Sequence, residues 1–186
     1  MREGAPLARH PCDEPAGIAP YTRCMARDDR LVRLSRDHHH ALVLALRIQR
    51  ELPRADDRAA TALINDTLRF WSAGLQLHIE AENGALLSRI AARGDEGLAL
   101  AGRLQREHRE LDEAITIVRG GSGHTDRHAA LTHFGSLLSA HIRWEERDLF
   151  EWLQSHLDED ELREAAATFA TRLPATPAAC PTPQML

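Results

Sequence analysis

The chain has 186 residues, of which 43% are hydrophobic and 27% charged, and its formal net charge is −5 when the histidines are neutral. This length suits one domain with a substantial core, and the composition is typical of soluble globular proteins. The lack of a basic cluster argues against a nucleic-acid partner, and no apolar run reaches the roughly 20 residues of a membrane span.

Both ends of the chain lack helical periodicity. Residues 1–27 mix proline, glycine and cysteine, and we expect them to form a loose extension. Residues 173–186, LPATPAACPTPQML, contain four prolines and predict a disordered tail. The folded domain is therefore expected to span residues 28–172.

Four long helical patterns and one short pattern fill this domain. Their expected ranges are 28–52, 57–92, 96–119, 125–156 and a short helix capped by Asp158 and Glu161. Pro53 and the pair Gly120-Gly121 mark two of the helix ends. No segment shows the alternation of a β-strand. Short connections favour antiparallel neighbours, so we predict an all-α, up-down-up-down four-helix bundle with a short fifth C-terminal helix.

The second and fourth helical patterns repeat each other at an offset of 63 residues. HIEAE at 78–82 matches HIRWE at 141–145, so that His78 and Glu82 correspond to His141 and Glu145. Each histidine lies one helical turn before its glutamate on the apolar face of the helix. Two carboxylates that point into one core need a strong cation nearby. Burying a carboxylate without a partner costs on the order of several kcal/mol.

The first and third helical patterns repeat each other at an offset of 70 residues. LSRDHHHALVLALRI at 34–48 aligns with LQREHRELDEAITIV at 104–118, which places His38 on His108 and Asp37 on Glu107. His38 also fits the apolar face that runs from residue 31 to residue 52. Neighbouring helical residues point about 100° apart, so His39 and His40 are expected to turn away from the core.

Four inward histidines and two inward glutamates form a chemically coherent set. Imidazole and carboxylate ligands suit iron, zinc or manganese better than calcium. Two carboxylates can bridge two metal ions while the histidines occupy the outer positions, and bundle cores are known to hold such dinuclear sites.

The chain at this point resembles the hemerythrin-like (HHE cation-binding) family. The resemblance rests on DHHH at 37–40, HIEAE at 78–82, EH at 107–108 and HIRWEE at 141–146, and it covers roughly residues 29–157. It implies a dinuclear non-haem iron centre inside a four-helix bundle. Carried over by position, the implied metal ligands are His38, His78, Glu82, His108, His141 and Glu145.

One departure from the oxygen-carrying members concerns a fifth histidine. Those proteins have a His-x-x-x-His pair in the third helix, whereas Leu104 and Asp112 flank His108 at that spacing here. The chain therefore resembles the four-histidine branch, which is linked to iron or oxygen sensing, nitric oxide response, peroxide handling and iron–sulfur repair. Asp112 is left as an alternative ligand to the metal or to a metal-bound water.

The expected function is binding or sensing of a small ligand (O2, NO or peroxide) at an open iron position. The alternatives are a redox enzyme that consumes peroxide or NO at the same centre, and a role in iron delivery or iron–sulfur repair. A tyrosyl-radical mechanism is disfavoured because the only tyrosine, Tyr21, lies in the N-terminal extension. The three cysteines, Cys12, Cys24 and Cys180, form no Cys-x-x-Cys pair, which favours a reducing, cytoplasmic location.

Several other polar residues are expected to have ordinary roles. His124 and His128 follow GGSG at a helix start and are expected to be solvated, His133 points off the apolar face, and His156 is too far from Glu145 to share its site. Glu80 and Glu146 flank the ligands and are expected at the surface or as hydrogen-bond partners of the ligands.

Overall fold

The structure is a computed structural model, and it describes residues 27–121 and 123–173. The predicted disorder of the C-terminal tail, nearly all of the predicted N-terminal extension, the three cysteines and Tyr21 lie outside the described residues. Every regular element in the described part is helical, which confirms the predicted all-α class. No helix in this part combines the length and the apolar character that crossing a membrane would require.

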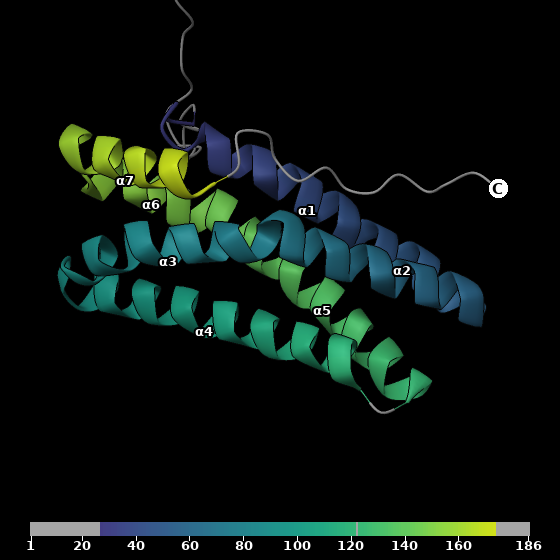
Figure 1. Cartoon of the computed structure of the whole chain (residues 1–186). Coiled ribbons are helices and arrows are strands. Elements are labelled where there is room, and N and C mark those ends of the chain that lie inside the picture. The colour runs from purple at the N-terminus through teal and green to yellow at the C-terminus, as the bar shows by residue number, and fades with distance from the viewer. Residues whose placement is uncertain (1–26, 122, 174–186) are drawn as a thin grey trace, which may run out of the picture.

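Four long rods and one short helix make up the bundle, as predicted (Figure 1). The elements are α1 (Val32–Glu51), η1 (Leu52–Arg54), α2 (Asp57–Phe70), η2 (Trp71–Leu75), α3 (Gln76–Ala91), α4 (Gly94–Gly120), α5 (His124–Trp144), η3 (Glu145–Leu149), α6 (Phe150–His156) and α7 (Glu159–Arg172). The second rod is α2, η2 and α3 in sequence, and the fourth is α5, η3 and α6. The long helices pack α4 on α5, α1 on α5 and α3 on α4, while α7 covers one end of α3.

The helix ends follow from local side-chain and backbone chemistry. The Asp56 carboxylate accepts a hydrogen bond from the backbone N–H of Ala59 and so caps α2. Asp158 and Glu161 form the predicted capping box at the start of α7. Gly94, the first residue of α4, adopts φ 73°, a left-handed conformation that favours glycine.

Two hydrophobic clusters fill the bundle. One cluster includes Trp71 and Phe134, whose rings meet edge to face with centroids 6.0 Å apart, so both aromatic residues serve in core packing as predicted. The other cluster lies nearer α7 and includes Leu34, Leu104 and Phe150. The buried histidines and glutamates belong to neither cluster.

The sequence patterns did not reveal two π-helical turns, η2 and η3. In the second rod Thr67, Phe70 and Trp71 are buried while Leu68, expected on the buried face, is only partly buried. The turn η3 begins at Glu145 itself, and η2 ends three residues before His78. Such π-helical turns occur frequently at functional sites.

Candidate metal centre

The six predicted ligands come together in the middle of the bundle. His38 belongs to α1, His78 and Glu82 to α3, His108 to α4, His141 to α5 and Glu145 to η3. The four histidines are 2–4% exposed, and both glutamates are 0% exposed. The first helix is therefore oriented as predicted, because His38 is buried whereas His39 is exposed.

Each glutamate faces both pairs of histidines. Glu82 places Oε1 3.1 Å from Nε2 of His78 and 3.7 Å from Nε2 of His38, and its Oε2 lies 3.4 Å from Nε2 of His108. Glu145 places Oε2 3.2 Å from Nε2 of His38, and its Oε1 lies 3.3 Å from Nε2 of His141. The two carboxylates thus span the space between a His38–His78 pair and a His108–His141 pair.

Within the described residues, no hydrogen bond satisfies these carboxylates. Both oxygens of Glu82, both oxygens of Glu145 and Nε2 of His108 are buried without a hydrogen-bond partner in the described part of the chain. Two ionised carboxylates at zero exposure are strongly unfavourable unless cations compensate them. Imidazole nitrogens and carboxylate oxygens converging on such a site fit transition-metal ions.

The outer nitrogen of each histidine is held by a partner from another helix. The Nδ1 atom of His38 lies 2.7 Å from Glu146, that of His78 3.3 Å from Asp37, that of His108 2.8 Å from Asn83 and that of His141 2.9 Å from Glu107. A carboxylate or amide oxygen only accepts, so each Nδ1–H donates. Each Nε2 therefore faces inward, where it can bind a metal ion once it has lost its proton.

These four partners obey the same repeats as the ligands. Asp37 and Glu107 are 70 positions apart and each precedes a histidine of the cluster. Asn83 and Glu146 are 63 positions apart and each follows a glutamate of the cluster. The sequence repeat aligns Asp37 with Glu107, and Glu146 was expected at the surface or as a hydrogen-bond partner of the ligands. No role was predicted for Asp37, Asn83 or Glu107. Their positions beside the ligands in both repeats were the available signal.

The electrostatics of the metal-free cluster favour positive charge on His38, His78 and His141, whose pKa values are raised. Burial by itself would lower the pKa of His38, but the carboxylates of Glu145, Glu146 and Glu82 outweigh it and raise that pKa well above its usual value. Burial likewise opposes the charge of His78, and Glu82 and Asp37 raise its pKa to about 9. Burial would raise the pKa of Glu82, but the neighbouring histidines hold it well below the usual range. The cluster is thus a cation site that protons and metal ions compete to fill.

A small cavity of about 10 Å³ adjoins the cluster on the side of Trp71 and Phe134. Its walls combine four members of the cluster with apolar side chains, namely His38, His78, His141, Glu145, Leu75, Ile79, Leu111, Leu138 and Ile142. Its volume approaches the space that one water-sized molecule needs. The space beside these residues therefore admits at most a very small molecule.

The other candidate residues lie outside the cluster. Asp112 is exposed, which removes it as a ligand, and its neighbour Leu111 lines the cavity instead. His128 lies with Nε2 3.3 Å from the carbonyl oxygen of Leu52, and His156 stacks on Trp152. The side chain of His124 lies outside the described part of the structure.

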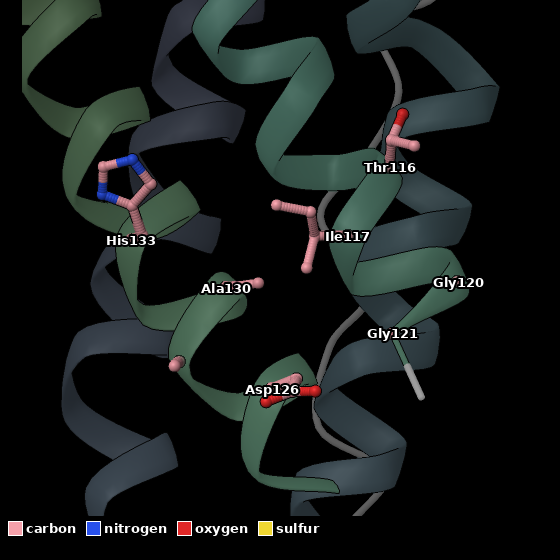
Figure 2. A pocket seen from close by; sticks show the side chains of 8 residues that line it. Thr116, Ile117, Gly120, Gly121, Asp126, Ala130 and His133 are labelled. Carbon is pink, nitrogen blue, oxygen red and sulfur yellow. The ribbon is translucent and has the colours of Figure 1, made fainter. Parts of the chain in front are cut away.

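His133 lines a shallow surface hollow rather than the centre. Figure 2 shows this hollow between α4 and α5, with Ile117 on one wall and His133 on the other. Its polar side chains, Thr116, Asp126 and His133, are all exposed. The hollow therefore lacks the buried, convergent polar groups that distinguish the cluster.

Comparison with known proteins agrees with this geometry. No match was found among curated proteins or among solved structures. The family model of the Hemerythrin HHE cation binding domain matches residues 30–153, which is more than half of the chain and includes all six clustered residues. On this match, the chain belongs to the hemerythrin HHE cation-binding domain family.

Proposed function

We propose that the cluster holds two iron ions and that the protein binds or senses a small ligand beside them. His38 and His78 would hold one ion, His108 and His141 would hold the other, and Glu82 and Glu145 would bridge them. The orientation of the carboxylates supports two ions rather than one, because each glutamate directs one oxygen to each histidine pair.

The number of ligands supports an open centre. Two histidines and two shared carboxylate oxygens leave each ion with fewer than six protein ligands. Bound iron would supply two oxidation states and a free coordination position for an exogenous ligand. The described residues would hold the ions rigidly, since the outer nitrogen of every histidine has a hydrogen-bond partner.

The small volume of the cavity is the observation that supports this class of ligand. With about 10 Å³ of space, it suits O2, NO or peroxide and excludes an organic substrate of ordinary size. Its apolar wall of leucines and isoleucines favours a small molecule of low polarity.

The same wall favours binding over cleavage of peroxide. General acid catalysis needs a proton donor within hydrogen-bond reach of the reacting atom. The residues that line the cavity offer none apart from the clustered histidines and Glu145, which the metal would occupy. Burial of all six ligands also argues against a role in ready iron delivery, because release would require the bundle to open.

The test is metal analysis followed by ligand exposure. Protein loaded with ferrous iron under anaerobic conditions is expected to hold about two irons per chain and to change its optical spectrum on exposure to O2 or NO. Glu82→Gln should lose one or both irons, whereas Glu80→Gln, in the same helix but exposed, should keep both. Tightly bound zinc that iron cannot displace would contradict the redox proposal, and rapid multiple turnover of peroxide would favour the enzyme instead.

A further inference from the structure

Half of the hydrogen-bond network around the cluster is chemically the same for both histidine pairs. Arg33 pairs with Asp37, which holds His78, and 70 residues later Arg103 pairs with Glu107, which holds His141. In each case an arginine, a carboxylate and a histidine follow one another. In this half of the network, the two metal positions therefore have hydrogen-bond partners of the same charge.

The other half differs in charge. A carboxylate, Glu146, holds His38, whereas a neutral amide, Asn83, holds His108 at the equivalent position of the repeat. The bond to Glu146 is 2.7 Å long and connects a buried imidazole to a partly buried carboxylate. A hydrogen bond to an ionised acceptor is stronger than one to a neutral acceptor.

The surroundings of Glu146 fix its carboxylate for this role. Its Oε1 faces His38, while its Oε2 accepts hydrogen bonds from Arg27 at 2.9 Å and from Ser35 at 3.1 Å. The Arg27 guanidinium also lies 4.7 Å above the ring of Phe150, which stacks on His38. Arg27 offsets part of the negative charge, but it does so at the oxygen that points away from the histidine.

An anionic acceptor on Nδ1 makes the opposite nitrogen of an imidazole a better electron donor. Groups of this kind typically change metal affinity by about 10–100-fold. The His38–His78 pair has two anionic partners, Glu146 and Asp37, whereas the His108–His141 pair has only Glu107 in that role.

We propose that Glu146 is a positioning residue that makes the His38–His78 position the tighter of the two metal positions. Acting through His38, it causes this position to fill first, and Asn83 leaves the His108–His141 position weaker. The inference rests on the dinuclear centre proposed above and adds an order of filling to it.

The test uses the metal-free full-length protein and Co(II), whose optical spectrum reports each binding step. The wild type is expected to bind two ions in separable steps. His38→Ala should remove the tighter step, and His108→Ala the weaker one. Glu146→Gln, which changes charge with little change of shape, should weaken the tighter step about 10–100-fold, as expected for loss of such a partner. Asn83→Asp should strengthen the weaker step.

Arg27→Gln separates the effect of charge from a structural effect. It removes the cation beside Glu146 but keeps the carboxylate on His38, so the tighter step should persist or strengthen. If Glu146 served only to anchor Arg27, both variants would weaken that step alike, and the proposal would be overturned. Glu146→Asp, which keeps the carboxylate, should retain most of the affinity that Glu146→Gln loses. Thermal unfolding of each metal-free variant shows whether the bundle is intact.

Two further outcomes are decisive. Two ions of equal affinity in the wild type, or equal weakening of both steps by Glu146→Gln, would overturn the order of filling and leave the dinuclear centre standing. A single ion per chain would instead contradict the dinuclear centre, and with it the present proposal.

Discussion

The Nδ1 atom of His38 lies 2.7 Å from Oε1 of Glu146, a residue 108 positions later in the chain. This bond joins the first long helix to the last one, directly behind the proposed metal ligands. The geometry of the centre therefore exists only in the docked bundle. Metal binding and folding should be coupled, because the unfolded chain cannot present these ligands together.

Removal of the metal should lower the stability of the protein. A ligand that binds only the folded state stabilises it by mass action, by about 4 kcal/mol when its free concentration is 1,000 times its Kd. In the metal-free protein only protonated histidines can compensate the buried carboxylates of Glu82 and Glu145. Thermal unfolding with and without iron measures the difference. Equal Tm values after complete removal would show that the site does not stabilise the bundle.

The run of three histidines offers a positional prediction. His38→Ala should lose or disorder the centre, because the ring is buried and its Nε2 faces both glutamates. His39→Ala and His40→Ala should keep two irons, since His39 is exposed and its ring contacts that of His40 rather than the cluster. Iron content and the optical spectrum of each purified variant check the prediction. Loss of iron in His39→Ala with retention in His38→Ala would refute the orientation of α1.

The buried cluster was predictable from the sequence because helical periodicity acts on each of its residues separately. His38 and His108 each lie on an apolar face, and the two repeats identify both members of each pair. The π-helical turns were not predictable in this way, because the turn depends on how the whole rod packs. Thr67, a polar residue, is buried where Leu68 was expected, which hydrophobicity alone could not indicate.

The hydrogen-bond partners of the histidines could not be predicted from the sequence, for a related reason. Asp37 and Asn83 are next to ligands in the sequence, so they point about 100° away from them on the same helix. Each reaches a histidine of a different helix, His78 or His108, and those contacts depend on how the helices are arranged around the core. Asp112 illustrates the opposite case, because its spacing from His108 permitted a ligand while the structure leaves it exposed.

The metal-free and metal-bound proteins should respond to pH in opposite directions. The pKa of His78 is about 9 in the folded metal-free protein and about 6.5 when unfolded. A raised folded pKa contributes stability that is fully present below pH 6.5 and is lost as the pH rises through about 9. The metal-free Tm should therefore fall over this range.

Metal binding should strengthen over the same range, because the ion must displace the protons on His38, His78 and His141, whose pKa values are all raised. Competition titrations against a chelator between pH 6 and pH 9, about the range set by these pKa values, measure the apparent affinity. Affinity that does not change with pH would contradict the proton competition. A metal-free Tm that rises with pH would contradict the stabilising role of the charged histidines.

The last prediction concerns the apolar wall of the cavity. Leu138→Ala should enlarge the space beside His141 and cost about 2–5 kcal/mol in the free energy of unfolding, as large-to-small changes in a core do. The iron-loaded variant should then bind imidazole, which the wild type excludes by size, while NO binds to both. Optical titrations with the two ligands measure this selectivity. Leu153→Ala is the matched control, since Leu153 is equally buried but belongs to the other hydrophobic cluster. It should lose comparable stability without admitting imidazole. If both variants admit imidazole, or neither does, the wall around Leu138 does not set the size of the ligand.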